Sequence, residues 1–321
     1  MRFSLTRITL YGVLATILFL LPVFVKSVYV MHIINMSLIY IIVVSGLNII
    51  MGYCGQFALA HSAFYGVGAY TSAILSTRFG ISFWICLPAA VIASCIAGFL
   101  TSLPCLKVKG HYLAMVSLGL GIVIHEAMVN LENLTNGAAG IINIPPPFLF
   151  GVSLDTDHRY YPIILVFTIL SILFVKSLLR FKVGRAFIAI RESYTAAEAM
   201  GINHRFFKVQ GFVLSASYAG LAGSLYVHLV KFVSPDSFGL GELITEFAML
   251  IVGGVGTLGG PVLGAIILSF AYEYLRALHS LQMITYGVMI LLFVLFMPRG
   301  LVTIKDWVFA LRKGAHSASS G

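Results

Sequence analysis

The sequence predicts an all-α integral membrane protein with about ten transmembrane helices, and three observations indicate this fold class. Apolar residues (AVILMFWYC) make up 60% of the 321 residues and charged residues only 10%, whereas a typical globular domain is about 25% charged. Uncharged tracts of membrane-spanning length follow one another along the chain, and Lys and Arg gather in alternate loops between them. This composition argues against a disordered chain and against an ordinary soluble enzyme.

The tracts between charged residues mark the candidate spans, because a helix needs about 20 apolar residues to cross a bilayer. The tract from 27 to 77 is too long for one span, and Gly52 and Gly55 near its middle divide it into helices of about 28–51 and 57–77. Clustered glycines and a proline between 253 and 261 separate two further helices by a turn. The other candidate spans are the uncharged tracts 8–25, 79–106, 110–125, 160–175, 209–230 and 277–298.

The distribution of Lys and Arg predicts the orientation. With the N-terminus inside and ten spans, 14 of the 20 basic residues fall on the cytoplasmic side, where the positive-inside rule puts them. Both termini and residues 180–208 are then cytoplasmic, and residues 132–159 are external. The net charge of +9 therefore reflects membrane orientation rather than nucleic-acid binding, since no basic stripe is present. Bilayer lipid is the expected surrounding of the chain.

The domain organisation is predicted to be simple. Residues 1–313 form a single transmembrane domain, and 314–321 is a small, polar, flexible tail that resembles an expression tag. The first 26 residues resemble a signal peptide, but their uncharged run is 18 residues long and no cleavage site follows. We therefore interpret this segment as an uncleaved first span.

The sequence contains no convincing motif of a soluble enzyme. Gly254, Gly256 and Gly259 imitate a dinucleotide-binding fingerprint, but membrane-length helices flank them instead of a strand–helix–strand unit. The chain contains no phosphate-binding loop and no G-x-S-x-G elbow, so it is not expected to be an enzyme or to hydrolyse ATP itself. We expect no catalytic residues, no metal site and no cofactor in this chain. The cysteines are interpreted as small buried apolar residues: Cys54, Cys86, Cys95 and Cys105.

Small residues that recur every four positions predict close helix–helix packing, because packing drives helix association in lipid. Three such sets occur: Gly256, Gly260 and Gly264; Ser215, Ala219 and Gly223; and Ala89, Ala93 and Ala97.

The cytoplasmic segment 184–208 is longer than a connection requires and predicts a short helix. Residues 191–200 favour a helix, and Gly201 is suited to end it. The alternative is a basic loop with no other role.

Four segments of the chain together resemble the permease subunits of branched-chain amino acid ABC importers, of the Liv-type M family. They are Gly46–Leu75, Leu106–Ile141, Gly184–Ala265 and Met297–Val302. The resemblance implies an ABC importer permease in a bacterial cytoplasmic (inner) membrane, paired with a homologous permease as a heterodimer. It also implies two ATPase subunits that bind ATP and Mg, and a periplasmic or surface binding protein. Two alternatives stay open: the same machinery for urea or short amides, and a stand-alone secondary transporter or channel.

Permeases of ABC importers in general carry an E-A-A-x-x-x-G signature where they dock on the ATPase. Ala196, Ala197 and Gly201 match this signature in register, whereas Thr195 stands in the place of the glutamate. The resemblance therefore implies that Glu192 or Glu198 takes over the missing charge. The expected coupling residues are Arg191, Glu192, Ala196, Ala197, Glu198 and Gly201.

Polar side chains at membrane depth usually face a cavity or the interior of the helix bundle. The segment 52–65 combines glycines with such groups and is the first candidate for the substrate pathway. The expected pathway residues are Asn48, Gln56, His61, Ser62 and Tyr65. The alternative is that they bond neighbouring helices together. Glu126, Glu242 and Glu246 are placed towards the outer ends of their spans, with solvated or docking roles.

Overall fold

The computed structural model describes residues 24–108, 110–149 and 151–276, together with the isolated positions 19, 21, 22, 287, 288, 291, 295, 300 and 301. Three predicted segments lie outside the described residues, except for these isolated positions: the first span, the last span and the tail 314–321. The total of ten spans therefore stays a prediction.

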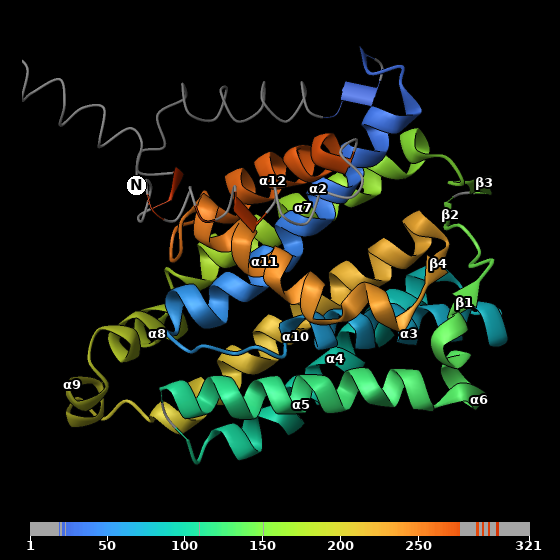
Figure 1. Cartoon of the computed structure of the whole chain (residues 1–321). Coiled ribbons are helices and arrows are strands. Elements are labelled where there is room, and N and C mark those ends of the chain that lie inside the picture. The colour runs from blue at the N-terminus through green and yellow to red at the C-terminus, as the bar shows by residue number, and fades with distance from the viewer. Residues whose placement is uncertain are drawn as a thin grey trace, which may run out of the picture.

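The described chain is a helical bundle with a few two-residue strands (Figure 1). The helices are α2 (Val28–Leu47), the π-helix η1 (Asn48–Tyr53), α3 (His61–Arg78), α4 (Phe83–Cys105), α5 (His111–Asn130), α6 (Glu132–Thr135), η2 (Gly137–Ala139), α7 (Asp157–Leu178), α8 (Lys182–Glu192), α9 (Tyr194–Ala199), α10 (His204–Val230), η3 (Pro235–Phe238), α11 (Leu240–Gly253) and α12 (Gly260–Arg276). The strands are β1 (Ile141–Ile142), β2 (Phe148–Leu149), β3 (Val152–Ser153) and β4 (Phe232–Val233). β1 pairs antiparallel with β4, and β2 with β3.

The helices confirm an all-α membrane fold. Within the part of the chain that the structure describes, five stretches are long and apolar enough to cross a membrane: Val28–Tyr53, Phe83–Cys105, His111–Asn130, Asp157–Leu178 and His204–Val230. Every expected span that falls within the described residues coincides with a helix. The expected division of the tract 27–77 is confirmed too, but the second helix begins at His61 and not at 57. Gly55 adopts a φ of +68°, and residues 54–60 form no helix.

Helix α10 lies at the centre of the described bundle and packs against α2, α3 and α4. Glycines let the backbones meet: a Cβ atom at Gly68 of α3 would lie 2.6 Å from the carbonyl oxygen of Gly220, and one at Gly223 would lie 2.6 Å from Ala69 N. Ser215 and Ala219 are buried on the same helix. The contact surface predicted from Ser215, Ala219 and Gly223 is therefore confirmed.

The contact surface predicted on α4 is displaced by one position. Ala89, Ala93 and Ala97 are only half-buried, whereas Ser94 and Gly98 face the bundle. Ser94 Oγ donates to the Phe64 carbonyl over 3.0 Å, and a Cβ atom at Gly98 would meet Ala216. Small residues occupy both registers of this helix, so their spacing alone does not tell the two apart. The large exposed side chains of α4 are all apolar or aromatic, as contact with lipid requires, and include Trp84, Ile85, Ile92, Ile96, Phe99, Leu100 and Leu103.

The two ends of the bundle differ. Helices α8 and α9 project at one end, and the strands and α6 lie at the other (Figure 1). The loop before α10 contains two short helices, where the sequence predicted one. At the same end, Lys208 Nζ donates hydrogen bonds to the carbonyl oxygens of Cys105 (2.7 Å) and Val108 (2.8 Å), which cap the end of α4. A cation at a helix C-terminus is favourable because it meets unpaired carbonyl groups.

Candidate functional site

The first candidate region is a break in a membrane helix. Helix α2 widens into the π-helix η1, which ends at Tyr53 and is followed by the non-helical residues 54–60 before α3 begins. This segment lies at membrane depth, because Leu59 N donates to Ser117 Oγ over 3.0 Å and Gly121 packs against Ala60. These two partners on α5 lie about 9–15 Å from the start of that helix. Residues 54–60, called the helix break below, are an irregular segment inside the membrane domain.

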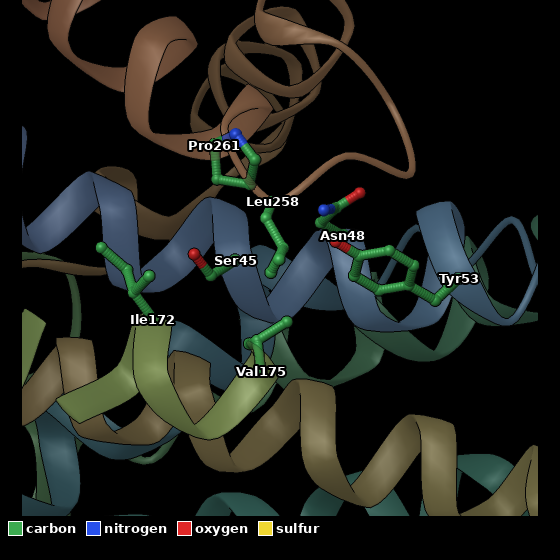
Figure 2. Close-up of a pocket in the computed structure, with 7 residues that line it drawn as sticks. All are labelled: Ser45, Asn48, Tyr53, Ile172, Val175, Leu258 and Pro261. Atoms are coloured by element: carbon green, nitrogen blue, oxygen red, sulfur yellow. The ribbon is translucent and has the colours of Figure 1, made fainter. Parts of the chain in front are cut away.

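Asn48 fixes this region to a second turn. Its Nδ2 donates to the Thr257 carbonyl over 2.8 Å, and its Oδ1 accepts from Gly256 N over 2.8 Å. The turn, residues 254–259, is called the glycine loop below. Figure 2 shows Asn48 beside Leu258 of the glycine loop and Pro261 of α12, around a cavity of about 10 Å³. That volume is about enough for one water molecule and far too small for an amino acid.

His61 forms a buried pair with Glu246. Its Nδ1 lies 2.8 Å from Glu246 Oε2, and the two side chains are 1% and 0% exposed. The pair joins the first residue of α3 to the middle of α11. Glu246 is therefore not in the solvated position that we expected from the sequence, because α11 is short and its middle is covered by α2 and α3.

The side chains of the remaining expected pathway residues also point into the protein interior. Gln56 Nε2 donates to Cys54 Sγ over 2.9 Å. Ser62 is buried, and the Tyr65 ring packs edge-on against Phe238 with their centroids 5.0 Å apart. The five expected residues thus gather around the helix break, but none is more than 8% exposed: Asn48, Gln56, His61, Ser62 and Tyr65. The outward surface of the break is instead formed by Gly55 and by Phe57, which is 53% exposed.

The second candidate region is the pair α8 and α9, called the docking helices below. Ser193 Oγ caps α9 by accepting from Ala196 N over 3.3 Å, and Gly201 ends the turn with a φ of +77°. Ala196, Glu192, Glu198 and Gly201 are exposed, as is Thr195, where the signature has its glutamate. Ala197 is only 3% exposed, so it packs against the chain itself.

Arg191 behaves differently from the other expected coupling residues. Arg191 is exposed like Glu192 beside it, but its Nη1 donates a hydrogen bond to the carbonyl of Gly52, inside the membrane domain. One end of this residue therefore belongs to the docking helices and the other to the helix break.

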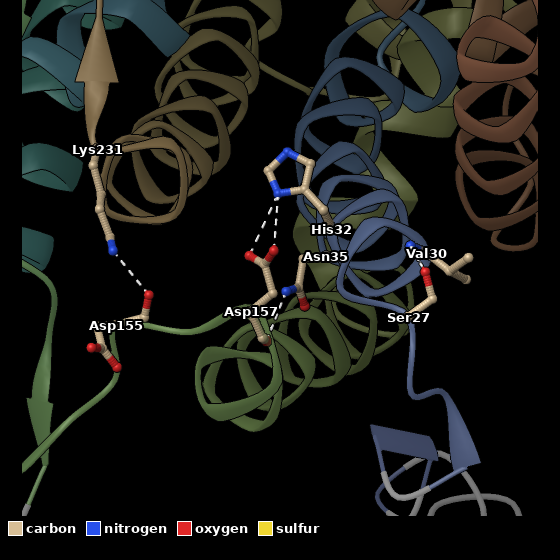
Figure 3. A network of polar contacts seen from close by, with 7 residues as sticks. All are labelled: Ser27, Val30, His32, Asn35, Asp155, Asp157 and Lys231. Carbon is tan, nitrogen blue, oxygen red and sulfur yellow. Dashed lines mark hydrogen bonds and ion pairs between the residues drawn. The ribbon is translucent and has the colours of Figure 1, made fainter.

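A third region lies at the opposite end of the bundle. Asp157 Oδ2 lies 3.4 Å from His32 Nδ1, and the Asp157 carbonyl accepts from Asn35 Nδ2 over 3.0 Å (Figure 3). Lys231 Nζ donates to the carbonyl of Asp155 over 2.9 Å. Residues at the ends of α2, α7 and α10 line a groove of about 820 Å³ here, and they include the charged residues Asp155, Asp157, Arg159 and Lys231.

Sequence reasoning missed three of these features: the pairing of His61 with Glu246, the inward reach of Arg191 and the groove. A signal existed for the first, because a histidine and a carboxylate in apolar tracts each need a buried partner. Neither the direction of the Arg191 side chain nor the groove has a sequence signal, since both depend on how distant helices pack. Among the described residues, no group of three or more metal-ligating side chains is present.

The comparisons with known proteins agree on one family. The family described as "branched-chain amino acid transport system / permease component" matches residues 29–297. The chain is 34% identical to the high-affinity branched-chain amino acid transport system permease protein LivM of Escherichia coli (strain K12) over 304 residues, which cover 88% of this chain and 72% of LivM. It is 25% identical over 288 residues to the permease protein LivH of the same strain, covering 82% of this chain and 91% of LivH.

A similar relative in another organism is BraD of Pseudomonas aeruginosa, named as a permease protein of high-affinity branched-chain amino acid transport. It is 24% identical over 284 residues, covering 82% of this chain and 91% of BraD. No solved structure matches the chain. The match over most of the chain and the membrane-length helices lead to one conclusion: this multi-pass membrane protein belongs to the branched-chain amino acid transport system permease family, whose members are transport subunits and not enzymes.

Proposed function

We propose that this protein is the permease subunit of an ATP-driven importer of branched-chain amino acids, in which it forms the substrate pathway with a second, homologous permease. The names of the relatives support the cargo, since LivM, LivH and BraD are all named for branched-chain amino acid transport. Two different permease proteins of this family, LivM and LivH, come from one bacterium. A heterodimer of unlike permeases fits that observation.

The exposed surface of the docking helices is the observation that carries the ATP-driven part of the proposal. Ala196 and Glu198 stand outward on the short helix α9, which Ser193 caps at its start, and the exposed Gly201 follows its end. Small outward residues let a partner groove approach closely, and the nearby Lys182 and Arg185 are exposed and suited to an acidic surface. We infer that two ATPase subunits, which hold ATP and Mg, dock here.

The distribution of charge supports the proposed orientation. The end with the docking helices carries Lys182, Arg185, Arg191, Arg205 and Lys208, so the positive-inside rule makes it cytoplasmic. The groove beside Asp157 and Lys231 then faces the periplasm or cell exterior, the side of a binding protein. We propose the bacterial inner membrane as the location, with both termini cytoplasmic.

The helix break supports the proposed pathway. Irregular backbone at membrane depth is tolerated where protein buries it or where it borders a water-filled cavity. We propose that the outward surface at Gly55 and Phe57 borders the pathway. The surrounding polar side chains (Asn48, Gln56, His61, Ser62 and Tyr65) then shape this border from behind.

The experiment that tests this proposal is purification of the permease with its neighbouring gene products, followed by ATPase measurements in lipid nanodiscs. We expect ATPase subunits and a second permease to copurify. We also expect hydrolysis to be stimulated by the binding protein loaded with leucine, isoleucine or valine. Stimulation by urea or acetamide in place of these amino acids would favour the alternative cargo. A permease that purifies without ATPases and transports leucine without ATP would contradict the proposal in favour of a secondary transporter or channel.

A further inference from the structure

Arg191 lies where the docking helices meet the membrane domain. It is in the last turn of α8, and its Nη1 donates a hydrogen bond to the carbonyl of Gly52 in η1. Within the described residues, no carboxylate lies within ion-pair distance of its guanidinium. The structure therefore directs this cation towards backbone carbonyl oxygen and not towards an acidic side chain.

The carbonyl of Gly52 needs a donor because its helix stops. The last carbonyl groups of a helix have no partner within it, and cations near them are favourable. After Tyr53 the chain enters the helix break: Cys54 N and Gln56 N still bond to the carbonyls of Ile49 and Ile50, but the helix does not continue beyond Gly52 far enough to serve its carbonyl. Arg191 supplies a donor from another part of the chain, 139 residues away in sequence.

Two more backbone segments contact the same side chain. A Cβ atom at Gly55 would lie 3.0 Å from Arg191 Cγ, and one at Gly256 would fall inside contact distance of Arg191 Nη1. The Gly256 Cβ atom would also lie 3.2 Å from the Gly52 carbonyl oxygen. The guanidinium thus packs between η1, the helix break and the glycine loop, where glycine leaves room for it.

Asn48 bonds η1 to the glycine loop through two hydrogen bonds of 2.8 Å, one donated and one accepted. The helix break continues directly from η1, so the three segments form one unit. A displacement of Arg191 therefore acts on the whole unit and not on a single carbonyl group. The planar guanidinium suits this position, because its rigid donor geometry holds the bond to the Gly52 carbonyl in a fixed direction.

We propose that Arg191 is a positioning residue that transmits movement of the docking helices to the helix break, and that it is not itself an ATPase contact. This inference rests on the proposed function, and it assigns Arg191 a different task from Glu198 and Ala196 on the outward side. Movement of α8 would carry the Gly52 carbonyl and the glycine loop with it. Without the guanidinium, the ATPases would still dock and hydrolyse ATP, but less amino acid would be transported for each ATP hydrolysed.

The test uses Arg191→Met and Arg191→Lys in the complete complex with the second permease, ATPases and binding protein. Methionine keeps most of the stem and removes every donor, while lysine keeps the charge and has one compact donor group. Arg180→Met is the matched control, because Arg180 is an exposed arginine in the turn before α8 and lies outside the docking helices. Three quantities are measured in proteoliposomes: copurified ATPase, ATP hydrolysis, and leucine uptake per ATP hydrolysed.

We expect Arg191→Met to retain the ATPases and to lower leucine uptake per ATP by about tenfold or more, within the usual range of coupling between two sites. Arg191→Lys should be intermediate and Arg180→Met unchanged. An unchanged uptake per ATP in Arg191→Met would overturn the inference, as would loss of the ATPases from a folded permease. If Arg191→Met does not fold, Arg191→Lys decides: a reduced ratio supports the inference and a wild-type ratio overturns it. Failure of the wild-type chain to bind ATPases would instead contradict the proposed function.

Discussion

The buried pair of His61 and Glu246 makes a quantitative prediction about stability. The two side chains are 2.8 Å apart and at most 1% exposed, so water cannot replace either partner. Removing one member of a buried ion pair typically costs about 3–5 kcal/mol, because the other charge is left uncompensated. We expect His61→Leu to fall in that range, since it leaves the Glu246 carboxylate buried without its partner.

The opposite substitution should be milder. In Glu246→Leu the remaining imidazole loses its hydrogen-bond partner, and a buried polar group without a partner costs about 1–3 kcal/mol. The double variant should be less destabilised than the sum of the two single variants, because no buried carboxylate or unpaired histidine is left. Thr245→Val is the control, since Thr245 is the neighbour of Glu246 on α11 and its hydroxyl donates to the Gly241 carbonyl of the same helix.

The assay is equilibrium unfolding of the purified permease in mixed micelles by increasing amounts of denaturing detergent, which gives free energies for all four variants. A coupling energy well above the usual additivity error of about 0.5 kcal/mol is expected between the two positions. The two side chains do not act as a pair if each single variant changes the free energy of unfolding by less than about 0.5 kcal/mol and the two changes add. The reasoning about the junction of α3 and α11 would then be refuted.

Three other substitutions test separate parts of the structure. Gly68→Ala should destabilise the protein by about 1–3 kcal/mol, because its Cβ would overlap the Gly220 backbone. The control Gly119→Ala should not, since no described atom lies within 4 Å of its Cβ. Equal melting temperatures of the two variants would contradict the close contact of α3 with α10. Asn48→Asp should lower the free energy of unfolding by about 1–3 kcal/mol in the same assay, because a carboxylate cannot donate to the glycine loop. Wild-type stability would show that this contact is dispensable. Ser193→Cys should react with a membrane-impermeant maleimide only after the cells are opened, and labelling of intact cells would place the docking helices outside.

Much of the helical layout follows from the sequence, because a charge inside lipid is costly and helices therefore fill the gaps between charges. The differences arise where a charged residue finds a local partner. Helix α10 begins at His204, before Lys208, since that lysine bonds to the carbonyl groups at the end of α4. Helix α5 continues past Glu126 to Asn130, whose Nδ2 donates to the Glu126 carbonyl over 2.8 Å.

The candidate site was predictable in position but not in detail. The glycines and polar residues between 52 and 65 indicated a break, and the break is present. Which side chains face inward depends on helix rotation and on partners far away in sequence, such as Glu246, 185 residues from His61. The same holds for the docking helices, where Ala197 turns inward and Ala196 outward. No spacing rule fixes this rotation without the helices against which α9 packs.

The most direct test of the central claim is leucine uptake into proteoliposomes that contain this permease, its partner permease and the ATPases, with loaded binding protein outside and nucleotide trapped inside. We predict that uptake requires internal ATP and stops when ATP is replaced by a non-hydrolysable analogue. Equal uptake with ATP, with the analogue and with no nucleotide would contradict the assignment of this chain to an ATP-driven importer.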